Sequence, residues 1–367
     1  MDTFKDRLSL LRTRMQETGT DLVALGPTSH MAWLSGADPH GDERPVLLLV
    51  SQTHAGFLMP ALNANSVRQA TDLPFETWTD ENGPAQALAT LLAACDATAP
   101  GLTVAIDEAM RADFALLLLD AMDAPVRRFS DTTLGALRAM KDAREIKALK
   151  NCARVNDAAA MAGFEALKPG MTERDIARVI ADHYKANGAK PEFTIVAFGA
   201  NGAYPHHHTG DTVLEQNMAV LIDTGCRLNG YPSDMTRCGW FGDAPDEEFL
   251  QVTSIVEKAV QAALATVRPG VIARDIDKAA RDVITAADYG DAFVHRTGHG
   301  LGIDIHEPPY ITATSEAVMQ AGNVFSIEPG IYLEGRFGVR LEDIVTVTDT
   351  GADVLSTLPR TIWTPSA

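Results

Sequence analysis

The pattern of apolar and polar residues divides the 367-residue chain into two portions. Up to about residue 130, apolar positions three and four apart predict helices over residues 3–18, 87–95 and 114–122. Short aliphatic runs between them predict strands over residues 21–25, 45–50, 55–59 and 103–106. Helices and strands that alternate in this way are typical of a small α/β domain.

A charged helical segment separates this portion from the rest of the chain. Between residues 132 and 150, Lys, Arg and Glu recur on a helical period, with charges three and four residues apart around Lys141 and Glu145. This pattern predicts an exposed linking helix. We therefore expect an N-terminal domain over residues 1–135 and a C-terminal domain over residues 136–367.

The C-terminal domain contains an internal repeat. Leu-Lys-Pro-Gly at residues 167–170 recurs as Val-Arg-Pro-Gly at residues 267–270, and Arg-Asp-Ile at residues 174–176 recurs at residues 274–276. Each half continues with an amphipathic helix, a loop that contains histidines, and strands that carry two acidic residues. The repeat predicts two pseudo-equivalent halves that face each other, so that four carboxylates converge on the midline.

Two of these carboxylates belong to a predicted hairpin. Asp223 follows four apolar residues, and a carboxylate in a buried strand is costly unless it is paired or bound to a metal. Asn229-Gly230 is a strong signal for a two-residue turn. Such a turn places Asp234 opposite Gly225, on the same sheet face as Asp223 and diagonal to it. Two bare carboxylates that close would repel each other, and divalent cations remove that cost.

The second half repeats the arrangement. Glu328 follows an apolar strand at residues 324–327, and Glu342 lies on a returning strand. His299 lies between two glycines, which allow the backbone to approach a crowded site. Four carboxylates and one imidazole suit a pair of divalent ions better than a single zinc ion. Two close ions can hold one hydroxide and polarise one carbonyl.

Histidines and an arginine near these acids are candidates for contact with a substrate. His206 lies in the histidine loop of the first half, and His306 lies in the corresponding segment of the second half. A histidine beside a tetrahedral intermediate can donate a hydrogen bond to the oxyanion or to the scissile amide. Arg340, two residues before Glu342, is a candidate for orienting either a ligand carboxylate or the metal-binding carboxylates.

Composition narrows the class of protein. The formal net charge of −18 opposes binding to nucleic acid or to an anionic membrane surface. No apolar run approaches the length of a membrane span, and the charged N-terminus lacks the apolar stretch of a signal peptide. The four cysteines form no close-spaced zinc or redox pair. We therefore expect a cytoplasmic protein whose partners include neither nucleic acid nor a membrane.

In order and spacing, the five predicted ligands resemble those of the pita-bread metallopeptidases, which are methionine aminopeptidase, aminopeptidase P and prolidase. The resemblance covers residues 141–346, and the preceding domain resembles the creatinase-type N-terminal domain of aminopeptidase P and prolidase. It implies an α/β N-terminal domain followed by an α+β pita-bread catalytic domain with an internal pseudo-two-fold duplication. The ligands carried over are Asp223, Asp234, His299, Glu328 and Glu342.

The resemblance also implies a role for each ligand. Asp223 and Glu328 would each bind chiefly one ion, and His299 would bind one of the two. Asp234 and Glu342 would bridge the pair. Glu328 would also serve as the proton shuttle. The ions would be manganese, or else cobalt, zinc or iron.

The activity that the resemblance implies is hydrolysis of the peptide bond before proline in a small peptide. His206, His295 and His306 match the substrate-site histidines of the family, and Arg340 matches an arginine near the bridging glutamate. Members are commonly homodimers. The alternatives are an Xaa-Pro dipeptidase and an Xaa-Pro aminopeptidase that acts on longer peptides. The short interval between Glu328 and Glu342 resembles that of compact bacterial and archaeal prolidases, which favours the dipeptidase.

Two further alternatives share the fold. One is a creatinase-like or ectoine-type amidine or amide hydrolase, and the other is a non-enzymatic pita-bread binding protein. Relatives of both kinds tend to lose metal ligands, whereas all five are present in this chain. The sequence therefore favours the metallopeptidase.

Overall fold

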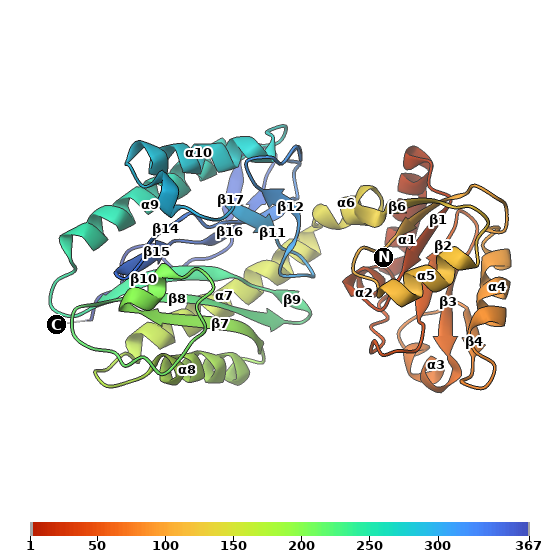
Figure 1. Ribbon diagram of the computed structural model, residues 1–367, viewed down its shortest axis with the longest axis horizontal. Coiled ribbons are helices and arrows are strands. Elements are labelled where there is room, and N and C mark those ends of the chain that lie inside the picture. The colour runs from red at the N-terminus through yellow and green to blue at the C-terminus, as the bar shows by residue number, and fades with distance from the viewer. Residues whose placement is uncertain (1–2, 366–367) are drawn as a thin grey trace. The chain divides into compact units, whose positions relative to one another are not determined.

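The computed structural model describes residues 3–365. The chain divides into two compact units, Met1–Arg138 and Ala139–Ala367 (Figure 1). Each unit has its own core of buried apolar side chains. Among the described residues, no helix has the length and apolar character needed to cross a membrane.

The first unit is built on a six-stranded sheet with the strand order β4-β3-β2-β1-β5-β6. Its predicted helices and strands are confirmed, with ends that shift by one or two residues. Strands β4 and β6 were not predicted, because their residues carry no apolar alternation; β6 is exposed throughout, and in β4 only Trp78 is buried. The strands are β1 Leu22–Leu25, β2 Leu47–Val50, β3 Ala55–Pro60, β4 Phe75–Trp78, β5 Thr103–Ile106 and β6 Val126–Phe129. The helices are α1 Thr3–Thr18, α2 Ser29–Ser35, α3 Ala61–Val67, α4 Ala85–Ala94 and α5 Ala112–Asp120.

The segment between the units differs from the predicted exposed linking helix. Helix α6 spans Leu134–Ala139, and a new helix, α7, spans Ala143–Glu165. Asp142 begins α7 with a capping box, in which its side chain accepts from the backbone N–H of Glu145. Lys141 and Glu145 are both buried, and Lys141 Nζ lies 2.7 Å from Glu307 Oε1. The charge pattern alone indicates a solvated face, because the partner of Lys141 is distant in the sequence.

The second unit shows the predicted duplication. Helix α10, Ala273–Ala286, repeats the bounds of helix α8, Glu173–Ala186, one hundred residues later. Gly170 and Gly270 both have a φ of 86°, a left-handed conformation that favours glycine. In Figure 1, α7 and α8 lie on one side of the strands of this unit, and α9 (Glu247–Thr266) and α10 lie on the other.

The remaining elements of this unit follow the same two-part order. The first half contains β7 Lys190–Phe198, β8 Met218–Leu228, β9 Tyr231–Pro232 and β10 Met235–Phe241. The second half contains α9 Glu247–Thr266, β11 Gly298–Gly300, β12 Glu307–Ile311, β13 Val324–Ile327, β14 Gly330–Leu333, β15 Phe337–Arg340, β16 Asp343–Val347 and β17 Ala352–Val354. Short 3-10 turns lie at Ser130–Thr132, Gly199–Ala203 and Gly290–Ala292.

The predicted hairpin register is confirmed. Asn229 and Gly230 have φ angles of 51° and 86°, as both central residues of a type I′ turn require. Strand β8 then pairs with β9 through Leu228 and Tyr231, and with β10 through Asp223 and Thr236. Both pairings keep one register, which puts Asp234 opposite Gly225, as expected.

Candidate metal centre

The five predicted ligands lie together. One carboxylate oxygen from each of Asp223, Asp234 and Glu342 lies within 4.8 Å of the other two. A second trio obeys the same limit and consists of His299, Glu328 and Glu342. Because Glu342 belongs to both trios, the five side chains form one cluster with two adjoining sets of donor atoms.

Breaks between strands allow the acids of the second half to reach the cluster. Glu328 directly follows β13 and precedes β14, and Glu342 lies between β15 and β16. The backbone N–H of Glu328 donates to Thr297 O at 2.8 Å, and that of Glu342 donates to Thr236 O at 3.2 Å. The last bond joins the second half to the strand that follows Asp234 in the first half.

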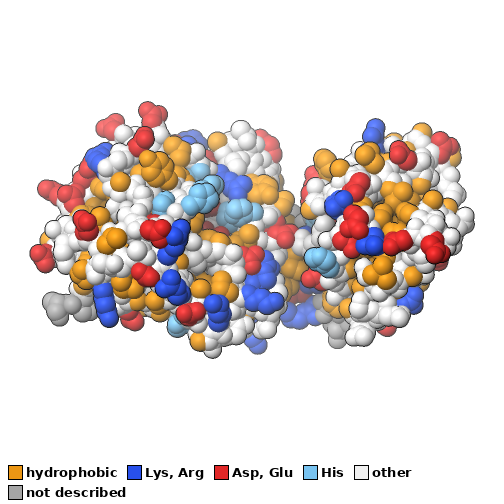
Figure 2. Space-filling model, turned by 60° about the horizontal axis from the view of Figure 1, so that its bottom comes forward, with side chains coloured by type: hydrophobic (Ala, Val, Ile, Leu, Met, Phe, Trp, Pro, Cys, Tyr) orange, Lys and Arg blue, Asp and Glu red, His pale blue; other side chains and the backbone are white. Residues whose placement is uncertain are grey.

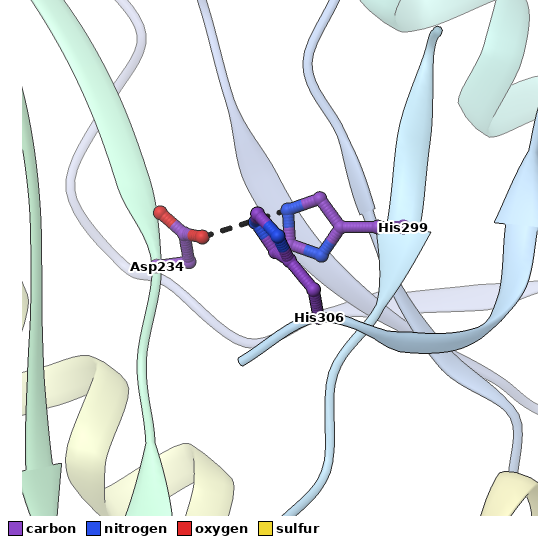
Figure 3. Close-up of side chains that lie close together, drawn as sticks. All are labelled: Asp234, His299 and His306. Atoms are coloured by element: carbon purple, nitrogen blue, oxygen red, sulfur yellow. Dashed lines mark ion pairs between the residues drawn. The ribbon is translucent and has the colours of Figure 1, made fainter. Parts of the chain in front are cut away.

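His299 presents an unprotonated nitrogen to the acids. Its Nδ1 lies 3.1 Å from Gly300 O, a geometry that assigns the ring proton to Nδ1. Its Nε2 lies 3.4 Å from Glu328 Oε1. The same nitrogen lies 3.6 Å from Asp234 Oδ2, an ion pair that Figure 3 draws as a dashed line. Burial lowers the pKa of His299 to about 3, so the ring is neutral at pH 7, as a metal ligand must be.

The glycines that flank His299 are required by space, as expected. A Cβ atom on Gly298 would lie 1.8 Å from Ser326 O. A Cβ atom on Gly300 would lie 2.3 Å from Glu307 O. Neither neighbour is a flexible side chain, so any larger residue would displace the strands that carry the ligands.

The acids of the cluster fit divalent cations. Burial, followed by repulsion from neighbouring carboxylates, raises the pKa of Asp234 and of Glu342 well above the usual range. Burial likewise raises the pKa of Glu328 to about 7. Oδ1 of Asp223 is buried and has no hydrogen-bond partner among residues 3–365. A cation between the trios would remove the repulsion and would give this oxygen a partner.

Arg340 holds Asp223 in place. Its Nη2 lies 2.6 Å from Asp223 Oδ2, and its Nη1 donates to the hydroxyl of Tyr332 at 2.8 Å. Its Nε donates to Thr236 Oγ1 at 2.9 Å. The guanidinium is buried, and all three nitrogens have partners in the protein. Of the two roles expected for Arg340, the geometry supports orienting a metal-binding carboxylate, and direct contact with a substrate stays a prediction.

Two hydroxyl groups that the sequence analysis missed orient the glutamates. Thr236 Oγ1 donates to Glu342 Oε2 at 2.7 Å, and Ser326 Oγ donates to Glu328 Oε1 at 3.0 Å. Thr236 lies two residues after Asp234, and Ser326 lies two residues before Glu328. Alternation along a strand places such residues on the face of the ligand, and this signal could have identified them.

His295 and His306 occupy different places around the cluster. Nδ1 of His295 donates to Arg296 O at 2.7 Å, and its Nε2 accepts from the hydroxyl of Tyr332 at 2.7 Å. Burial lowers the pKa of His295 to about 4, so this ring is neutral at pH 7. The His306 ring lies 3.9 Å from the His299 ring, and it forms a third close group with His299 and Asp234 (Figure 3). His306 is exposed and can therefore meet a substrate.

His206 lies in an anchored loop but outside both trios. Its neighbour His207 has a role that the sequence did not indicate, because its Nε2 lies 2.8 Å from Oε2 of the buried Glu173. The same oxygen accepts from Gly210 N at 2.7 Å. His206 itself is exposed, and its charge contributes to the lowered pKa of His306. His206 and His306 therefore lie near each other at the rim of the site.

Comparison with known proteins connects this geometry to one family. The description "Metallopeptidase family M24" matches residues 147–349, and "Creatinase/Prolidase N-terminal domain" matches residues 7–140. The predicted α/β N-terminal domain of creatinase type and the pita-bread catalytic domain are thereby confirmed.

Individual relatives match almost from end to end. The probable dipeptidase PepE of Mycobacterium tuberculosis is 36% identical over 98% of this chain and 96% of its own length. The Xaa-Pro dipeptidase of Pyrococcus furiosus is 32% identical over 97% of this chain and 99% of its own length. The crystal structure of dipeptidase PepE from Mycobacterium ulcerans matches with a TM-score of 0.94 and 34% identity, over 99% of both chains. Since the family match alone spans more than half of the chain, this protein belongs to metallopeptidase family M24, whose members work with divalent metal ions.

Proposed function

We propose that this protein is a dinuclear metal-dependent dipeptidase that cleaves the peptide bond before proline. The observation that supports it best is the pair of adjoining donor trios that share Glu342. Full-length relatives named dipeptidase and Xaa-Pro dipeptidase support the substrate class. We also propose that the protein works as a homodimer in the cytoplasm, where its four buried free thiols would stay reduced.

The proposed metal ligands are the five side chains of the cluster. Glu342 and Asp234 would bridge the two ions, because Glu342 belongs to both trios and Asp234 lies near Asp223 as well as His299. Manganese is the proposed metal, with cobalt, zinc and iron as alternatives. When bound, two such ions would lower the pKa of a water molecule and polarise the scissile carbonyl.

The chain itself would move the protons and hold the transition state. Glu328 is the proposed proton shuttle, because its side chain is 15% exposed, compared with 6% for Asp234. Of these two acids, Glu328 is therefore more accessible to solvent, and the hydroxyl of Ser326 donates a hydrogen bond to one of its oxygens. His306 at the rim would donate a hydrogen bond to the developing oxyanion, and His206 would support it from the same side.

A substrate panel tests this proposal. The chelated and the manganese-loaded protein would be assayed on Ala-Pro, Ala-Pro-Ala, Ala-Ala, creatine and ectoine. We expect metal-dependent cleavage of Ala-Pro above all others. Turnover of creatine or ectoine would support an amidine or amide hydrolase instead, and no turnover of any substrate by metal-loaded protein would support a binding protein.

A further inference from the structure

Arg296 lies on a rigid segment beside the cluster. It follows His295 and precedes His299 by three residues. Asp277 of α10 accepts hydrogen bonds from Thr297 N at 3.1 Å and from Thr297 Oγ1 at 2.8 Å. Arg281 of the same helix donates to His295 O at 2.9 Å. The backbone on both sides of Arg296 is therefore fixed to one helix.

The side chain of Arg296 is held by an aromatic ring. Its guanidinium carbon lies 4.8 Å from the ring centre of Tyr310, which is on β12. Stacking of this kind orients the planar group and leaves its N–H donors free at the edge. Tyr310 is 37% exposed, so the stacked pair lies where a ligand can reach it.

Arg296 differs from the other cations near the site in its ion pairing. Within residues 3–365, no carboxylate forms an ion pair with its guanidinium. By contrast, Arg340 is paired with Asp223, Arg281 with Asp277 and Lys141 with Glu307; these pairs are formed within the protein. A half-buried guanidinium without a partner is positioned to bind an external anion.

Strand pairing places the stacked pair beside the cluster. Tyr310 directly precedes Ile311, and Ile311 pairs with Gly298, the residue before His299. Arg296 is therefore close to the ligands that would surround the scissile bond. Figure 2 shows histidine side chains gathered on one face of this unit beside basic side chains.

The chemistry of the proposed substrate places an anion at this distance. In an Xaa-Pro dipeptide, only the proline nitrogen and Cα separate the scissile carbonyl carbon from the carboxylate carbon. The three bonds along this path, each of ordinary length, put the two carbons roughly 3–4 Å apart. A longer peptide carries a neutral amide at the same place. A residue that binds the carboxylate must therefore lie beside the metal ligands, and it would distinguish dipeptides from longer peptides.

We propose that Arg296, oriented by Tyr310, binds the C-terminal carboxylate of the substrate and makes the enzyme selective for dipeptides. This inference rests on the proposed function, since it concerns the substrate of the same site. It assigns the choice between dipeptidase and aminopeptidase to a single unpaired cation.

The test compares an acid with its amide. Ala-Pro and Ala-Pro-amide would be assayed with manganese-loaded wild type, Arg296→Gln and the matched control Arg274→Gln, which changes an exposed arginine paired with Glu316. Wild type should prefer the acid. In Arg296→Gln the KM for Ala-Pro should rise about ten- to a hundredfold, the value expected for a charge-assisted hydrogen bond, with little change in kcat. Kinetics on the amide should not change, and Arg274→Gln should behave as wild type.

Two variants of Tyr310 add a readout that a merely structural role would not give. Tyr310→Phe keeps the ring and should keep the preference for the acid, whereas Tyr310→Ala should lose part of it. An equal loss of activity on acid and amide in Arg296→Gln would overturn the inference, and so would an unchanged KM for Ala-Pro.

A binding measurement separates this inference from the proposed function. Calorimetry with proline and prolinamide reads carboxylate recognition without any turnover. If wild type fails to cleave Ala-Pro yet binds proline through Arg296, the proposed function is wrong and the inference about the carboxylate survives. If wild type cleaves Ala-Pro but Arg296→Gln binds proline as well as wild type does, the inference alone is wrong.

Discussion

Thr236 Oγ1 donates a hydrogen bond of 2.7 Å to Glu342 Oε2, although the two residues belong to opposite halves of the catalytic unit. Thr236 Oγ1 also accepts a hydrogen bond from Arg340 Nε at 2.9 Å. One hydroxyl group therefore connects the carboxylate shared by both donor trios to the guanidinium that holds Asp223. This contact makes the two halves depend on each other for the shape of the site.

Replacing Thr236 with valine should weaken metal binding. Thr236→Val removes the hydroxyl while keeping the shape, which leaves Glu342 without its donor and Arg340 Nε without its acceptor. Loss of such a contact behind a metal ligand costs about ten- to a hundredfold in metal affinity. Titration calorimetry with manganese measures this change.

Thr346 provides a matched control for that substitution. Its Oγ1 is buried and has no hydrogen-bond partner among the described residues. Thr346→Val should therefore leave manganese affinity unchanged and should not lower the melting temperature. Equal losses of affinity in the two variants would show that the role assigned to Thr236 is wrong.

Removing either proposed bridging acid should abolish activity. Asp234→Ala and Glu342→Ala each take an oxygen donor from a donor trio, so we expect both variants to bind less than two ions per chain. Elemental analysis after dialysis measures the content, and Asp349→Ala, which changes an exposed acid, is the control. Two ions still bound in either variant would contradict the ligand assignment.

The metal-free protein should show a pH dependence that comes from Glu328. Its folded pKa of about 7 lies above the ordinary value of 4.5, so the folded state holds a proton that the unfolded state releases between these pH values. Stability from this group is therefore present below about pH 4.5 and is lost as the pH rises through about 7. Glu328→Gln lacks this loss, so its advantage over wild type should grow by at most about 3 kcal/mol across the window.

Urea denaturation of chelated protein at pH 4.5 and pH 8 measures this advantage. The comparison reports Glu328 together with the repulsion that it exerts on Asp234 and Glu342. His295 and His299, whose pKa values are lowered and act in the opposite direction, are present in both proteins. A difference in unfolding free energy that stays constant with pH would show that Glu328 is not the group that titrates.

Gly298 should not tolerate a side chain. In Gly298→Ala the new Cβ would meet Ser326 O at 1.8 Å, so the strand that carries His299 must shift. We expect the unfolding free energy to fall by about 3 kcal/mol and metal affinity to fall with it. Gly135→Ala is the control, because its nearest neighbour, Ser130 O, would lie at 3.4 Å and alanine favours the helix. Equal melting temperatures for the two variants would contradict the packing argument.

The features that could be predicted from the sequence are those set by local chemistry. Asn229 and Gly230 determine the turn, and the turn determines the pairing of Asp223 with Thr236. The repeat of the Pro-Gly turns fixes the equal bounds of α8 and α10. Together with the segments around His299, Glu328 and Glu342 and the family resemblance, these signals predict the five side chains that the structure brings together.

The features that could not be predicted join residues that are far apart in the chain. Nothing near Lys141 indicates that Glu307 will pair with its ammonium group, and nothing near Thr236 indicates that Glu342 will accept a hydrogen bond from its hydroxyl. The stacking of Arg296 on Tyr310 depends likewise on how β11 and β12 pair. Such contacts arise from the packing of one strand against another, which a periodicity of two or four residues does not encode.

The two-residue turn at Asn229-Gly230 has a consequence for how this site can evolve. Side chains alternate between the faces of a strand, so the catalytic face is selected by the parity of the count between Asp223 and Asp234. Insertion of one residue between an unchanged two-residue turn and Asp234 would turn Asp234 toward the opposite face and would destroy the donor trio. Insertion of two would restore its orientation, so length changes in this short stretch of strand should survive only in even steps.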